Sequence, residues 1–151
     1  MRATLGIALA TTLSAAVISA YAHSGASGVV MERMELMKSI QGHMKVVGEM
    51  LQGKRDFAAE AVKTAGKTIA GQADEIPHKF PEGSIEGPSE ATQSIWEDWD
   101  TFIRLSEELK VKALAMADAA ENATDVSAIR THFAAIGKTC SACHQDFRRE
   151  K

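Results

Sequence analysis

The sequence predicts an all-α protein, an antiparallel up-down-up-down four-helix bundle. Apolar residues recur at helical spacing in four segments of the chain, and no segment offers a strand pattern. All three prolines lie together in one loop between the second and third helical segments. The first and third links are short and the middle one is longer, a connectivity that makes successive helices antiparallel.

Residues 1–22 have the features of a secretory signal peptide. One charge, Arg2, precedes an apolar run that ends in Ala20-Tyr21-Ala22, so we expect cleavage after Ala22 and export, to the periplasm if the source is Gram-negative. The run is short for a membrane span, although an uncleaved anchor is the alternative. Residues 23–151 are then one domain.

The charge of the domain is ordinary. The whole chain has a formal net charge of −3, which becomes −4 once Arg2 is removed with the signal. With no basic patch, this charge argues against a nucleic-acid partner. It is compatible with a redox partner protein but does not identify one.

The first predicted helix covers residues 28–51 and is rich in methionine. Its seam has the 3-4 spacing of a bundle helix and consists of Met34, Met37, Gln41, Met44, Gly48 and Leu51. The apolar face is widened by Leu36, Ile40, His43, Val47 and Met50. Gly53 then stops the helix.

Three more helices follow. The second spans about residues 56–74 and precedes a proline- and glycine-containing loop over residues 76–89. The third is expected from Ser89, as its N-cap, to about Asn122, with Trp96 and Trp99 in or beside the core. The fourth begins after Asp125, and its core stripe consists of Val126, Ile129, Phe133, Ile136, Cys140, His144 and Phe147.

Cys140-Ser141-Ala142-Cys143-His144 is a c-type haem attachment motif. The two thiols add to two vinyl groups on one edge of the porphyrin, and His144 supplies the proximal nitrogen to the iron. On a helix, Cys143 and His144 lie roughly 300° and 400° round from Cys140, so one face carries both anchors and the ligand.

Three other readings of the cysteine pair are weaker. A thioredoxin-like redox pair belongs to a strand-helix pattern, which this chain does not offer. A structural zinc site needs two further ligands, and the remaining histidines form no second cluster. A plain disulfide would suit an exported protein, but it leaves the adjoining His144 unexplained.

A methionine of the first helix is the candidate sixth iron ligand. The last helix runs antiparallel to the first, so His144 lies level with the early part of the first helix. Met34 and Met37 are therefore favoured over Met44 and Met50, although methionine also fills irregular core space. Spacing alone does not separate Met34 from Met37.

The chain resembles the class II cytochromes c, the cytochrome c-prime family, across residues 28–151. The resemblance is carried by Ile136-Gly137-Lys138, by the haem motif with Phe147-Arg148, and by Arg33-Met34-Glu35-Leu36-Met37-Lys38. In low-spin members, of the cytochrome c-556 type, a methionine at the position matched by Met37 binds the iron. The loop over residues 79–84 is also similar to the low-spin branch.

The resemblance further implies roles for two arginines and an assembly. Arg148 is expected beside the proximal imidazole, and Arg33 near a haem propionate. Members of the family often form homodimers through their first two helices, so a homodimer is possible here.

The sixth position of the iron separates two functions. If Met37 binds, the protein is a one-electron carrier with His144/Met37 ligation and one covalent haem c. If Met37 only packs, the five-coordinate iron binds nitric oxide or carbon monoxide. Electron transfer is the favoured prediction, and gas binding is the alternative. An enzyme is the weakest reading, because a peroxidase would need polar acid-base groups where the first helix offers thioethers and aliphatics.

Overall fold

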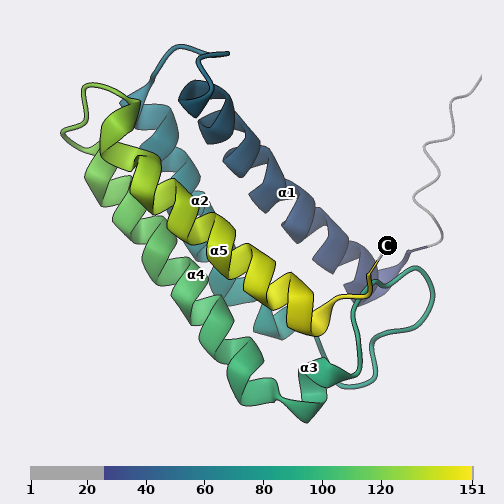
Figure 1. Cartoon of the computed structure of the whole chain (residues 1–151). Coiled ribbons are helices and arrows are strands. Elements are labelled where there is room, and N and C mark those ends of the chain that lie inside the picture. The colour runs from purple at the N-terminus through teal and green to yellow at the C-terminus, as the bar shows by residue number, and fades with distance from the viewer. Residues whose placement is uncertain (1–25, 151) are drawn as a thin grey trace, which may run out of the picture.

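The computed structural model describes residues 26–150, and these residues form an antiparallel four-helix bundle (Figure 1). The long helices are α1 (Gly28–Leu51), α2 (Ala59–Glu75), α4 (Trp99–Ala120) and α5 (Arg130–Phe147). The short elements are the 3-10 turns η1 (Pro77–Lys79) and η2 (Val126–Ile129) and the one-turn helix α3 (Ser94–Glu97). The predicted fold class is confirmed. The predicted signal peptide lies outside the described residues.

Helix α1 has the predicted bounds. It ends in a turn in which the backbone N–H of Gln52 donates to the Gly48 carbonyl (3.1 Å), and Gly53 follows with a φ of +69°. This left-handed conformation favours glycine, so the predicted stop at Gly53 is confirmed. Ile40, Val47 and Met50 are buried in the core of the bundle.

Helices α2 and α4 pack closely. A Cβ at Gly66 of α2 would lie 2.6 Å from the carbonyl oxygen of Ala113 and 2.8 Å from the Cβ of Ala117, both on α4. The Ser106 hydroxyl of α4 donates to the Ala73 carbonyl of α2 (2.6 Å). Small side chains therefore bring these two backbones together, as the alanine-rich sequence of α2 suggests.

The predicted third helix is wrong at its start. The first helical turn begins only at Ser94. Asp98 then interrupts the helix, because it adopts a non-helical conformation (φ −132°, ψ 57°) and caps α4 by accepting the N–H of Thr101 (3.3 Å). Ser89 is buried, and its hydroxyl accepts the N–H of Ala91 (3.2 Å) instead of capping a helix. The third helix of the bundle thus consists of α3, a break at Asp98, and α4.

Smaller differences concern other helix ends. Helix α2 begins at Ala59, three residues after the predicted start, because Ala58 is extended (φ −135°, ψ 100°). The last helix begins after Asp125 as predicted, with the 3-10 turn η2 first, and the Asp125 carboxylate accepts the N–H of Ser127 (2.7 Å). Trp96 and Trp99 pack against the core, also as predicted.

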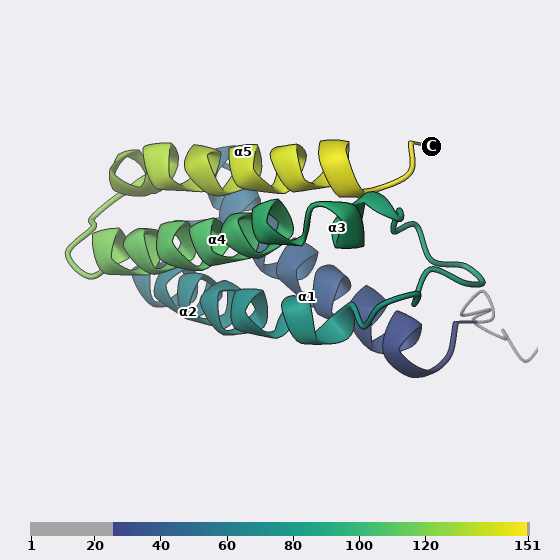
Figure 2. The ribbon, with the colours of Figure 1, turned by 90° about the horizontal axis from the view of Figure 1, so that it is seen from below.

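Three segments meet at one end of the bundle. Figures 1 and 2 show the start of α1, the C-terminal end of α5 and the loop between α2 and α4 at this end. The haem motif near the end of α5 is therefore level with the first turns of α1, as the antiparallel arrangement predicts. Within residues 26–150, no helix combines the length and the apolar character needed to cross a membrane.

Candidate haem-binding site

A cavity of about 640 Å³ lies between α1, α4, α5 and the loop over residues 76–93. Its volume falls within the roughly 300–1,000 Å³ of small-molecule and cofactor sites. The structure brings all six site residues named from the sequence to its lining, and these are Arg33, Met37, Cys140, Cys143, His144 and Arg148.

Helix α5 supplies the wall that carries the cysteines. Cys140 and Cys143 are free thiols and partly buried, one turn apart on the face that lines the cavity. Burial, helped by the charges of Cys140 and Asp146, raises the pKa of Cys143 to about 11, and burial also raises the pKa of Cys140. Two thiols beside an open volume fit the covalent attachment of a haem.

His144 follows on the same face and is exposed, although it also lines the cavity. Partial desolvation, together with the positive charge of Arg148, lowers the pKa of this imidazole, and the negative charge of Glu90 opposes the shift. The imidazole is therefore neutral at pH 7, which is the form that binds a metal.

Arg148 lies just beyond the end of α5, one turn after His144. Its Nε donates to a carboxylate oxygen of Glu90 (2.7 Å), and the ion pair involves Nη2 as well. The guanidinium lines the cavity and acts on the imidazole through its charge. The role of Arg148 beside the iron-bound imidazole stays a prediction.

Helix α1 supplies the opposite wall. Met34, Met37, Gln41 and Met44 of the predicted seam all line the cavity. Met34 is 43% exposed and belongs to the rim, whereas Met37 is partly buried and packs against the core residues. Phe102, Leu105 and Leu109 of α4 add apolar surface.

Arg33 lines the cavity, but its guanidinium is bonded to the loop. The side chain is 6% exposed and lies 3.9 Å from the centre of the Phe80 ring. All five N–H groups donate to neutral oxygens, which are the Lys79 carbonyl, the Ser84 carbonyl and hydroxyl, and the Ser89 hydroxyl (2.7–3.1 Å). Burial lowers the pKa of Arg33, which nevertheless stays protonated.

The sequence did not predict these hydrogen-bond partners of Arg33. Ser84 and Ser89 lie in a loop whose proline and glycine content predicts irregular backbone but not the direction of any carbonyl. The predicted contact between Arg33 and a haem propionate stays a prediction.

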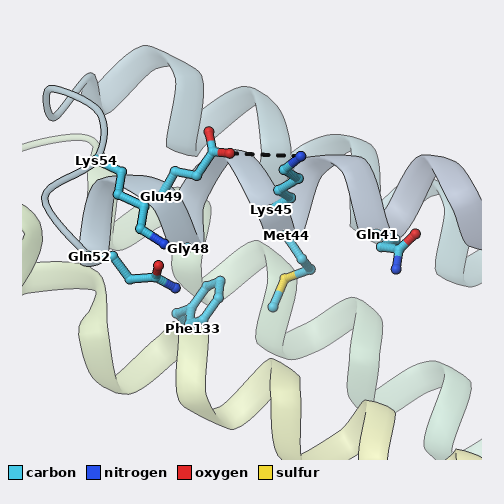
Figure 3. A pocket seen from close by; sticks show the side chains of 8 residues that line it. All are labelled: Gln41, Met44, Lys45, Gly48, Glu49, Gln52, Lys54 and Phe133. Carbon is cyan, nitrogen blue, oxygen red and sulfur yellow. Dashed lines mark ion pairs between the residues drawn. The ribbon is translucent and has the colours of Figure 1, made fainter.

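A second, shallower hollow of about 440 Å³ lies farther along α1 and α5 (Figure 3). Met44 and Gln41 line both hollows. At the far side, the ring of Phe133 on α5 lies beneath Gly48 of α1, and a Cβ at Gly48 would be 3.4 Å from the ring. Within the described chain, no group of three or more His, Cys, Asp or Glu side chains is placed to hold a metal ion.

The family model described as cytochrome C' matches residues 28–148. A cytochrome c-556 from Agrobacterium fabrum is 36% identical over 126 residues, which cover 83% of this chain and 84% of that protein. A cytochrome c' from Halomonas halodenitrificans is 31% identical over 118 residues, which cover 74% and 89% of the two chains.

Solved structures agree with these relatives. The cytochrome c' from Rhodopseudomonas palustris superposes with a TM-score of 0.76 at 27% identity, covering 83% of this chain and 99% of that one. The cytochrome c prime from Shewanella frigidimarina gives 0.74 at 29% identity, covering 81% and 94%.

Proposed function

The chain belongs to the cytochrome c' family, and we propose on this basis that it is an exported one-electron carrier with His144 and Met37 as the axial ligands of its haem. Proteins of the family bind haem c covalently and are electron carriers or gas-binding haem proteins of the periplasm. Cys140 and Cys143 are the residues of this chain that would hold the haem. When bound, the haem iron would supply the one-electron redox change.

The observation that carries the proposal is the position of Met37. The partly buried Met37 lines the same cavity as His144 from the facing helix, whereas Met34, one turn earlier, lies at the rim of the cavity and is 43% exposed. If the Met37 thioether and the His144 imidazole hold the iron in both oxidation states, the reduction potential would be raised and electron transfer would need little rearrangement.

The experiment compares Met37→Ala with Met34→Ala. We expect the ferric holoprotein to have a low-spin spectrum with a weak sulfur-to-iron charge-transfer band that disappears in Met37→Ala. Met34→Ala is the matched control, because it removes a thioether from the same wall, and we expect it to keep the band. A high-spin spectrum that Met37→Ala leaves unchanged would contradict the proposal.

Gas binding is the second candidate, and the apolar lining of the α1 wall favours it. With Met37 only packed in place, five-coordinate iron beside thioethers and aliphatic side chains would bind carbon monoxide or nitric oxide. Ready carbon monoxide binding by the unmodified ferrous protein, together with a high-spin ferric spectrum, would establish this function instead.

The destination and partners of the protein are part of the proposal. Export rests on the signal-peptide pattern of residues 1–22, with cleavage after Ala22, and the N-terminal sequence of the mature protein tests it. We propose that the electron is exchanged with a periplasmic redox protein. One solved cytochrome c' is described as having ligand-controlled dimer dissociation, and sedimentation of the holoprotein tests for a homodimer here.

A further inference from the structure

The loop segment of residues 79–92 is hydrogen-bonded both to α1 and to the end of α5, the two helices that face each other across the cavity. Phe80, Pro88, Ser89, Glu90 and Ala91 of this segment line the cavity themselves. The segment therefore forms part of the cavity wall as well as linking η1 to α3.

One attachment of the segment is to α5. The backbone N–H of Arg149 donates to the Glu90 carbonyl (2.8 Å), and its guanidinium donates to the Ser89 carbonyl (2.7 Å). Ala91 and Arg148 form an antiparallel bridge, and the N–H of Thr92 donates to the Phe147 carbonyl (3.1 Å). These bonds involve the residues three to five positions after His144, so they fix the segment to the C-terminal end of α5.

The other attachment is Arg33 of α1. All five N–H groups of its planar guanidinium donate to oxygen atoms of residues 79, 84 and 89, and the guanidinium stacks on the Phe80 ring. Phe80 is in turn held by Trp96, whose indole N–H donates to the Phe80 carbonyl (3.0 Å). Arg33 precedes Met37 by one helical turn, so both side chains lie on the same face of α1.

We propose that Arg33 is a positioning residue that holds the 79–92 segment closed over the rim of the haem cavity, fixing the Met37 turn of α1 and restricting access of small ligands to the iron. The claim that Arg33 fixes the Met37 turn rests on the function proposed above. The claim that it restricts ligand access is independent of that function, because it follows from the attachment of the segment to α1 and α5.

The geometry specifies an arginine. Lysine offers three donors on a single nitrogen and cannot reproduce a planar fork bonded to three loop residues, although it keeps the charge. Arg33→Lys therefore separates two roles. If Arg33 acts only through its positive charge, Arg33→Lys should behave like the wild type. If the hydrogen bonds of its guanidinium hold the segment, Arg33→Lys should lose that function.

The experiment uses the ferric and ferrous holoprotein of the wild type, Arg33→Lys and Arg33→Gln. Hydrogen exchange of residues 79–92 and the rate of carbon monoxide binding are measured together with the sulfur-to-iron band. We expect about a tenfold increase in exchange and in carbon monoxide binding rate for both variants, as for the loss of one charge-assisted hydrogen bond, and a weakened band. Arg104→Lys on the exposed face of α4 is the control and should change none of these.

Ser84→Ala keeps the proposal testable if either Arg33 variant fails to fold. It removes one acceptor hydroxyl and should shift exchange and carbon monoxide binding in the same direction by a smaller factor. Wild-type exchange and binding rates in Arg33→Lys, with changes only in Arg33→Gln, would overturn the proposal in favour of a charge effect. Absence of the band in the wild type would overturn the Met37 ligation alone, while exchange and binding rates still decide the closure.

Discussion

Helices α2 and α4 pack backbone against backbone, whereas α1 and α5 leave a cavity between them. At Gly66 the α2 and α4 backbones approach until an added Cβ would lie 2.6 Å from a carbonyl oxygen. At Gly48 an added Cβ would meet only the ring of Phe133, at 3.4 Å, and farther along the same two helices enclose a cavity of about 640 Å³. One pair of helices provides close packing, and the other provides space for a cofactor.

The largest expected effect is that of Gly66→Ala. The new methyl group would overlap the α4 backbone, which cannot move without separating the helices, so we expect unfolding to cost about 1–3 kcal/mol less. Urea denaturation measures the loss. Gly71→Ala on the same helix is the control, because its Cβ would meet nothing within 4 Å, and it should gain roughly 0.5–1 kcal/mol. Equal effects in the two variants would contradict the close packing of α2 on α4.

A smaller effect of opposite sign is expected for Gly48→Ala. A methyl group 3.4 Å from the flexible Phe133 ring needs little adjustment, and alanine is the better helix former. We therefore expect a gain of up to about 1 kcal/mol in the free energy of unfolding. A loss comparable to that of Gly66→Ala would show that α1 and α5 are packed as tightly as α2 and α4.

The smallest effect concerns pH and the surface that joins α4 to α5. Lys112 donates to the Glu108 carboxylate (3.0 Å) and to the hydroxyl of Thr139 on α5 (2.6 Å). The hydrogen bond from Lys112, followed by the charges of Lys112 and Arg104, lowers the pKa of Glu108 below its ordinary value.

Because the folded-state pKa is depressed, the contribution of Glu108 to stability is present above the unfolded pKa of about 4.3 and is lost as the pH falls through the folded value. Glu108→Gln should therefore be less stable than the wild type at pH 7, by less than about 1 kcal/mol, and equally stable in strong acid. Denaturation curves at both pH values measure the difference. A difference that persists in acid would mean that the carboxylate charge is not its source.

The sequence predicted which residues line the candidate site because the haem motif specifies one face of one helix. Once the last helix is antiparallel to the first, Cys140, His144 and Met37 have to face a common volume, and the structure shows one. The bounds of α1 could also be predicted from the sequence, because the apolar pattern is continuous up to Gly53. Ligation by Met37 stays a prediction.

The two failures have different physical causes. Ile95, Trp99 and Phe102 keep helical spacing across Asp98, so periodicity could not show the break that the Asp98 cap creates. Ser89 is a good N-cap by residue type, but the buried guanidinium of Arg33 uses its hydroxyl. The Ser89 contact joins residues 56 positions apart, which local patterns do not contain, whereas the Asp98 cap is local but leaves the apolar spacing unchanged.

The two walls of the cavity come from opposite ends of the described chain, which has a consequence for the order of folding. Many more residues separate α1 from α5 than separate α2 from α4, so bringing α1 and α5 together costs more conformational entropy. The α1–α5 contact is also less closely packed than the α2–α4 contact. We expect α2 and α4 to associate before α1 meets α5. Cys140 and Cys143 are then still accessible when the rest of the bundle has begun to form, which leaves an interval for haem attachment before the cavity closes.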